Sequence, residues 1–209
     1  MSIPRRQTVQ CPKCGADIEF TYWQSINTQM PNAIPDIISG KLFDVECKKC
    51  GNKTFVNYPM LFNDMIHNVM IYYTMPDDVE ETEKIMARTS KLLSCRNRIV
   101  TDQLTLREKA AIFNAELDDR VIEVLKLIIL LQVKEQLAGR EIMATYFHPG
   151  EEPVFEIVTD GDSGFVPVTM EMYEKVAEEF CNPLPEDDEY IIDQDWAQEF
   201  ISAWEEEQE

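Results

Sequence analysis

Two cysteine pairs near the start of the chain have the residue types and the spacing of a metal site. In each pair two residues separate the cysteines and a glycine follows, as Cys11-Pro12-Lys13-Cys14-Gly15 and Cys47-Lys48-Lys49-Cys50-Gly51. Zinc takes four ligands in a tetrahedron, and its structural sites are often four thiolates. A tight turn can aim both sulfurs of a pair at one ion, and glycine accepts the positive φ that such a turn needs. We expect one structural Zn²⁺ ion bound by four cysteines, Cys11, Cys14, Cys47 and Cys50.

Other uses of these cysteines were weighed against zinc. A single redox-active C-x-x-C would lie near a βαβ pattern, which two symmetric turns do not match. Residues 1–6 lack the apolar core of a secretion signal, so we expect a cytoplasmic protein, and disulfides are rare in that reducing compartment. Binding of a metal ion other than zinc remains an alternative. Cys95 and Cys181 stand alone in the sequence and are predicted to be buried as small apolar residues.

The stretch between the two pairs is longer than a compact zinc ribbon needs. Residues 15–46 make 32 residues, against roughly 15–20 in a compact ribbon. The excess predicts an insertion, and residues 30–40 have the form of a helical turn that starts with proline and ends at Gly40.

The net charge of −20 limits the classes of partner. Residues 151–209 hold one Lys or Arg against twenty Asp and Glu, so most of the negative charge lies in the last part of the chain. Such a balance disfavours nucleic acid and anionic membrane surfaces, and it attracts a basic partner. Solubility alone would also explain it. The most apolar run, residues 121–133, is interrupted by Glu123 and Lys126 and predicts a buried helix, not a membrane span.

The elements that would position the cysteines are short strands. Residues 17–23, 42–46, 53–58 and 69–74 have the composition or alternation of strands, and together predict a small sheet held by metal at one end. Helices are predicted after Pro76, over residues 104–117 and over residues 120–137.

A second, acidic region is predicted beyond residue 140. Strand-like runs at residues 154–158 and 165–168 flank a turn sequence, which indicates a hairpin. A helix over residues 169–180 and a terminal helix follow. The terminal helix carries Trp196, Phe200 and Trp204 four residues apart, and this stripe could be either core or interface.

The predicted fold class is therefore α+β: an N-terminal zinc-ribbon-like β-sheet, then helices, then a small acidic α+β C-terminal region. We place the domains at residues 1–140 and 141–209.

The pattern of the first part resembles the CpXC domain of bacterial and archaeal proteins. The two cysteine pairs carry this resemblance most specifically, supported by residues 22–27, 40–43, 58–65 and 111–123. It covers roughly residues 8–135. The second pair departs from the family's form because Lys48 stands where the family has proline. The resemblance implies a zinc-binding fold but no particular activity.

Three functions follow from these features. The expected one is a zinc-stabilised interaction or adaptor module with a protein partner. The acidic C-terminal region favours a basic partner. The alternative is a nucleic-acid-binding ribbon, since seven cations lie near Tyr22 and Trp23, namely Arg5, Arg6, Lys13, Lys41, Lys48, Lys49 and Lys53. An enzyme is not expected, because the two histidines, His67 and His148, lie in no catalytic motif. The oligomeric state is left open.

Overall fold

The computed structural model describes residues 2–89, 95–134, 136–137, 139–180, 187 and 189–208. The chain divides into two compact units, Met1–Ala110 (unit 1) and Ala111–Glu209 (unit 2). This division lies earlier in the chain than the predicted boundary at 140/141. The reason is that the long helix α4 (Asp119–Val133) packs with the C-terminal helices of unit 2. The mixed α+β class with an N-terminal sheet is confirmed.

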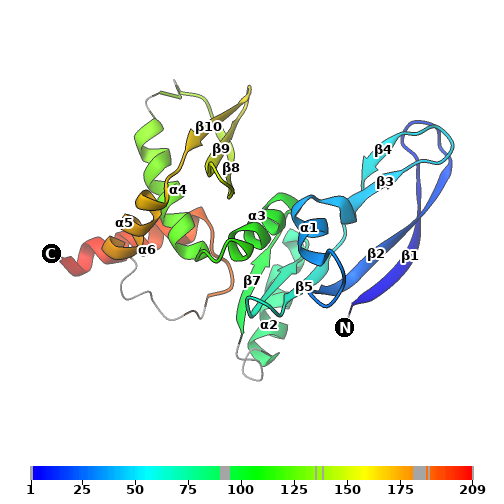
Figure 1. The fold of residues 1–209 in the computed structure, drawn as a ribbon, viewed down its shortest axis with the longest axis horizontal. Helices are drawn as coiled ribbons and strands as arrows, with labels where there is room; N and C mark the ends of the chain where they lie inside the picture. Colours follow the sequence, from blue (N-terminus) through cyan, green and yellow to red (C-terminus); the bar gives the residue numbers. More distant parts are fainter. Residues whose placement is uncertain are drawn as a thin grey trace. The chain divides into compact units, whose positions relative to one another are not determined.

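Unit 1 is built on a five-stranded sheet in the order β1-β2-β5-β6-β7. Its strands are β1 (Ile3–Gln10), β2 (Asp17–Asn27), β5 (Met60–Asp64), β6 (Val69–Tyr73) and β7 (Arg96–Val100). Only the last three residues of β2, Ser25 to Asn27, pair with β5, whereas β1 pairs along the length of β2. The rest of the β1–β2 hairpin therefore extends beyond the sheet as an arm (Figure 1).

A separate two-stranded sheet lies beside this arm (Figure 1). It is formed by β3 (Asp44–Glu46) and β4 (Lys53–Phe55), which pair antiparallel. The predicted insertion is confirmed as helix α1 (Ala33–Ile38), followed by Gly40 and the short 3₁₀ helix η1 (Lys41–Phe43). Gly40 has a φ of 76°, and Arg107 Nε donates a hydrogen bond of 2.8 Å to the carbonyl oxygen of Ile38. The insertion is therefore anchored to helix α3 (Gln103–Asn114).

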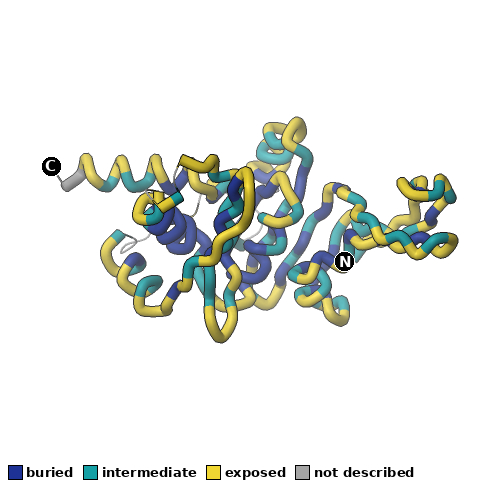
Figure 2. The backbone as a smooth tube through the Cα atoms, turned by 90° about the horizontal axis from the view of Figure 1, so that it is seen from above, coloured by how far each residue is buried: buried dark blue, intermediate teal, exposed yellow. Residues whose placement is uncertain are grey.

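The core of unit 1 contains buried side chains from the middle strands of its sheet and from one of its helices. Strands β5 and β6 alternate buried and half-buried residues, and Phe62 and Ile71 are fully buried. The 3₁₀ helix η2 (Pro76–Asp78) and helix α2 (Val79–Thr89) follow β6, and Met86 of α2 is fully buried. In contrast, the arm is mostly exposed or half-buried, as the yellow and teal tube beyond the N-terminus shows (Figure 2).

Unit 2 packs three helices and a small antiparallel sheet around one apolar core. Its sheet has the order β10-β9-β8, and the remaining elements are β8 (Ile142–His148), β9 (Val154–Thr159), β10 (Ser163–Pro167), α5 (Met170–Phe180) and α6 (Gln194–Gln208). Eleven residues of α4 are buried, which confirms the buried helix predicted from its apolar run. No helix in the described ranges is both long and apolar enough to cross a membrane.

Most of the aromatic stripe of α6 belongs to this core. Trp196 is 8% exposed, and its ring stacks on Phe200 with centroids 5.2 Å apart. Trp204 lies 4.8 Å from the ring of Phe180 in α5. Trp196 and Phe200 therefore pack with the core of unit 2, whereas Trp204 is half-buried and contacts Phe180, which packs against that core.

Candidate metal centre

Each cysteine pair forms the turn of a hairpin, and the two turns share one backbone pattern. In the first, the amide of Cys11 donates to the carbonyl of Ala16 at 2.8 Å, and the amide of Gly15 donates to the carbonyl of Cys11 at 2.9 Å. In the second, the amide of Cys47 donates to the carbonyl of Asn52 at 2.9 Å, and the amide of Gly51 donates to the carbonyl of Cys47 at 2.8 Å. We call these two turns the knuckles.

The glycines take the left-handed conformation predicted for them. Gly15 has a φ of 69° and Gly51 a φ of 68°. A side chain at this φ would be strained, because its Cβ crowds the backbone. The glycine after each cysteine pair is therefore a requirement of the turn that presents the sulfurs.

The four sulfurs of the knuckles meet at one point. All four Sγ atoms lie within 4.8 Å of one another. The Cys11–Cys50 and Cys14–Cys47 pairs are each 3.7 Å apart. A tetrahedral zinc site with Zn–S bonds of about 2.3 Å has sulfur–sulfur edges of about 3.8 Å, whereas a disulfide bond is only about 2.05 Å long. The geometry fits four thiolates around a metal ion and does not fit two disulfides.

Apolar side chains shield the cluster. Cys11 and Cys47 are 2% and 1% exposed, while Cys14 and Cys50 are half-buried. Ile18 from the arm and Val45 from β3 complete the buried cluster around them. Zinc sites of this closed, shielded form are structural because no ligand position is left for substrate.

The pKa values of two thiols in the cluster, Cys11 and Cys50, are shifted in opposite directions. Burial raises the pKa of Cys11, but the backbone amides of Cys14 and Lys13 and the thiols of Cys14 and Cys50 lower it to about 6. The amide of Asn52 lowers the pKa of Cys50, but burial and the three other thiols raise it to about 12. A metal ion bound by the cluster would need Cys50 as a thiolate, so binding would release the proton that its raised pKa retains.

Of the remaining cysteines, Cys181 lies outside the described residues. Cys95 is half-buried and is not part of the cluster. Burial raises its pKa, although a hydrogen bond with Asn97 acts in the opposite direction. A raised pKa keeps the thiol protonated, so Cys95 lacks the thiolate character of a nucleophile or a ligand.

The two histidines each face a carboxylate away from the cysteines. His67 Nδ1 lies 2.6 Å from Oδ2 of Asp64, which is only 1% exposed. The other Asp64 oxygen accepts from the amides of Ile66 and His67. Sequence analysis missed this buried carboxylate, although an aspartate three residues before a histidine is a signal for such a turn. His148 Nε2 lies 2.9 Å from Oε2 of Glu156 on an exposed sheet face.

The seven cations proposed for nucleic-acid binding divide into two sets. Arg5 donates to Gln24 at 3.0 Å, and Lys41 pairs with Asp36 at 3.1 Å. Arg6 and the four lysines near the knuckles are exposed, namely Lys13, Lys48, Lys49 and Lys53. Tyr22, one of the proposed stacking residues, instead packs edge-on against Tyr58 with ring centroids 5.5 Å apart.

Comparison with known proteins agrees with this geometry. Residues 9–126, more than half of the chain, match the family described as CpXC protein. No curated protein and no solved structure matches the chain significantly. The matched range includes both knuckles and ends inside α4. The chain therefore belongs to the CpXC family.

Proposed function

We propose that unit 1 holds one structural zinc ion through the four clustered cysteines, and that the chain acts as a protein-interaction or adaptor module. The cluster of four sulfurs within 4.8 Å carries this proposal. Within the described residues, no backbone ladder joins the β3–β4 hairpin to the five-stranded sheet. A metal ion shared by the two knuckles would therefore supply a connection between this hairpin and the arm.

A role in binding, rather than catalysis, follows from the chemistry of the ligand set. Four thiolates fill a tetrahedral ion, so no open position is left for water or substrate. Zinc held in this way contributes to the folding free energy and fixes a surface. The proposed activity therefore lies in surfaces that the knuckles hold in place.

The charge of unit 2 supports a basic protein as partner. Unit 2 holds five Lys and Arg against 26 Asp and Glu, whereas unit 1 holds 14 against 13. Such a surface raises the rate at which positively charged partners associate, and it repels phosphate. We propose that unit 2 binds the partner and that unit 1 supplies the metal-stabilised fold.

The metal part is tested by elemental analysis of the purified protein. We expect one zinc per chain, and loss of that zinc in Cys14→Ser and in Cys47→Ser, because three thiolates bind zinc more weakly than four. Cys95→Ser is the matched control and should keep its zinc, since Cys95 lies outside the cluster. Full zinc content in Cys47→Ser would refute the assignment.

The partner part is tested by affinity capture from native lysate at graded salt. We compare the wild type with a variant in which four exposed glutamates of α5, Glu171, Glu174, Glu178 and Glu179, become glutamine. The control variant neutralises four exposed acids of unit 1, Asp17, Glu19, Asp44 and Glu46. We expect a basic protein that is lost with the α5 variant and kept by the control. Equal capture by both variants contradicts the proposal.

The nucleic-acid alternative has a weaker physical basis. Arg6, Lys13, Lys48, Lys49 and Lys53 have no ion pair within the described residues. Four acidic residues on the same two hairpins offset their charge, and a zinc tetrathiolate would add two negative charges. A gel-shift assay with single-stranded oligonucleotides at low salt decides this point. A shift that Lys48→Gln and Lys49→Gln abolish would favour the alternative.

A further inference from the structure

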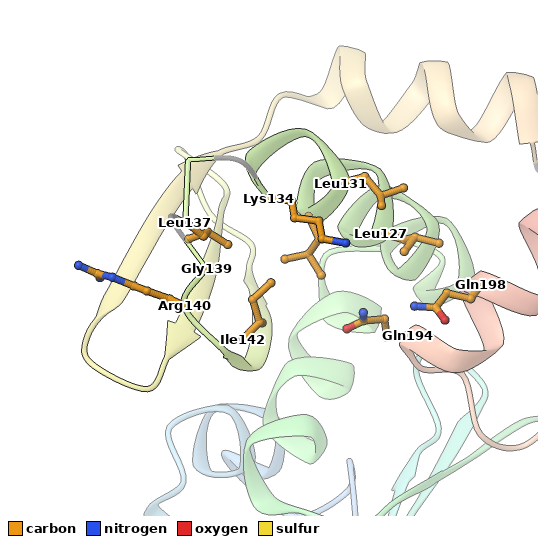
Figure 3. Close-up of a pocket in the computed structure, with 10 residues that line it drawn as sticks. Leu127, Leu131, Lys134, Leu137, Gly139, Arg140, Ile142, Gln194 and Gln198 are labelled. Atoms are coloured by element: carbon orange, nitrogen blue, oxygen red, sulfur yellow. The ribbon is translucent and has the colours of Figure 1, made fainter.

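A cavity of about 290 Å³ opens in unit 2, apart from the metal centre. It lies between the C-terminal end of α4, the first turns of α6 and the start of β8 (Figure 3). Its volume is close to the lower end of the range for small-molecule sites, roughly 300–1,000 Å³. Every lining residue comes from unit 2.

One wall of the cavity is purely aliphatic. Its side chains are Leu127, Leu130, Leu131, Leu137 and Ile142. Leu127 and Leu130 are buried, whereas Leu131 is 62% exposed. Among the described lining residues, no side chain is aromatic or acidic. A wall of this kind matches a flexible hydrocarbon chain, and it offers no ring for stacking.

Four polar side chains line the cavity as well, and Arg140 is described below. Lys134 comes from the end of α4, and Gln194 and Gln198 come from α6. Figure 3 shows both glutamines reaching from α6 toward the side chains of α4. Within the described parts of the chain, none of the three has a hydrogen bond or an ion pair. They therefore offer an ammonium group and two amides to a ligand.

Among the described residues Lys134 has no ion-pair partner, although unit 2 holds 26 acidic residues. The neighbouring cations of unit 2 are paired: Arg120 with Asp118, Lys126 with Glu123 and Arg140 with Asp162. Arg140 also lines the cavity, but its side chain points away from it (Figure 3). Of the two cations in the described lining, Lys134 is thus the one whose charge is available to a ligand.

We propose that this cavity binds an aliphatic monocarboxylate, with the hydrocarbon chain against the leucine wall and the carboxylate on Lys134, Gln194 and Gln198. An ammonium and amide N–H groups donate to a carboxylate, and a charged acceptor strengthens such hydrogen bonds. The net negative charge of unit 2 is screened over about 8 Å at physiological salt, so the groups in the cavity decide the sign of the preferred head group.

The test is a calorimetric titration of the full chain with three eight-carbon probes: octanoate, octanol and octylammonium. We expect octanoate to bind most tightly and octylammonium most weakly, because only the carboxylate pairs with Lys134. In a series from hexanoate to decanoate, affinity should rise about fourfold for each added methylene until the cavity is full. Octanol binding as tightly as octanoate, or no saturable binding of any probe, overturns the proposal.

Two variants separate the head-group contact from general effects. Lys134→Met should weaken octanoate binding at least tenfold and leave octanol binding unchanged. Lys175→Met, on the exposed face of α5 and outside the described lining, is the matched control. Like Lys134, Lys175 is a lysine of unit 2 with no ion pair to a described residue. Leu131→Gln changes an exposed wall residue, which spares the fold, and should weaken octanoate and octanol alike. Equal octanoate affinity in both lysine variants refutes the assigned role of Lys134.

Discussion

At the scale of single residues, Tyr58 contributes both aromatic packing and a side-chain hydrogen bond to unit 1. Its ring centroid lies 5.0 Å from that of Phe43 and 5.5 Å from that of Tyr22. Its hydroxyl donates a hydrogen bond of 2.9 Å to the carbonyl oxygen of Leu42. Burial raises the pKa of Tyr58 to about 12, although a hydrogen bond from the backbone amide of Trp23 acts in the opposite direction.

This raised pKa predicts how stability depends on alkaline pH. The folded protein holds the Tyr58 proton more tightly than the unfolded chain, whose tyrosine pKa is about 10. The contribution of Tyr58 is therefore complete below pH 10 and is lost as the pH rises toward 12. We expect the unfolding free energy of Tyr58→Phe to fall less over this range than that of the wild type, as measured by denaturant titration at each pH.

The same substitution has a cost at neutral pH. It removes the donor to Leu42 and should destabilise the protein by about 1 kcal/mol at pH 7. Ultraviolet titration of the folded protein provides an independent check, because the most weakly acidic tyrosine signal should disappear in the variant. An unchanged high-pH tyrosine transition would show that Tyr58 is not the group with the raised pKa.

At the scale of elements, the knuckles depend on glycine for their backbone and not for space. A Cβ placed on Gly51 would meet no atom within 4 Å, yet the φ of 68° disfavours any side chain. We expect Gly51→Ala to lower the unfolding free energy by about 1–2 kcal/mol, from backbone strain alone. Thermal or denaturant unfolding of the zinc-loaded protein measures this effect.

Gly150→Ala is the matched control for this prediction. Gly150 also has open space around its Cβ position, but its φ is not in the left-handed region. Its substitution should change the unfolding free energy by no more than about 0.5 kcal/mol. If the two variants were equally stable, the positive φ of Gly51 would not be a requirement of the knuckle.

Two strands of unit 1 illustrate which elements the sequence pattern does not predict. Strand β1 was not predicted because its side chains are almost all exposed on the arm, so no apolar alternation marks them. Strand β5 was not predicted because its buried positions are Met60, Phe62 and Asp64. An aspartate at a buried position breaks the apolar pattern, and here it is explained by its bond to His67.

At the scale of the whole molecule, metal removal should affect the two units differently. We expect a strong chelator to raise hydrogen exchange at the amides of Cys11, Gly15, Cys47 and Gly51, whose bonds close the knuckles. The amides of β9, the central strand of unit 2, should keep their protection because its core contains no cysteine cluster. Hydrogen exchange followed by mass spectrometry measures both units in one experiment.

The control for this prediction is Cys47→Ser, which should behave like the chelated wild type and respond no further to chelator. Unchanged exchange of the knuckle amides after metal removal would mean that the apolar cluster of Ile18 and Val45 is sufficient to hold the hairpins.

By itself, the sequence determined what is local. The spacing of each cysteine pair and its glycine specified a tight turn with two converging sulfurs, because the required geometry spans only a few bonds. The apolar run of α4 specified a buried helix, and the α6 stripe specified an amphipathic one, because helical periodicity is also a local property.

Only the tertiary structure decided what is non-local. It paired Cys11 with Cys50 and Cys14 with Cys47 across the two knuckles. It packed Trp196 and Phe200 of the α6 stripe with the core of unit 2, and it assigned α4 to that unit. It also placed Lys134 beside a wall of leucines. Such contacts join residues far apart in the chain, and their geometry depends on how whole elements pack, which no short sequence window contains.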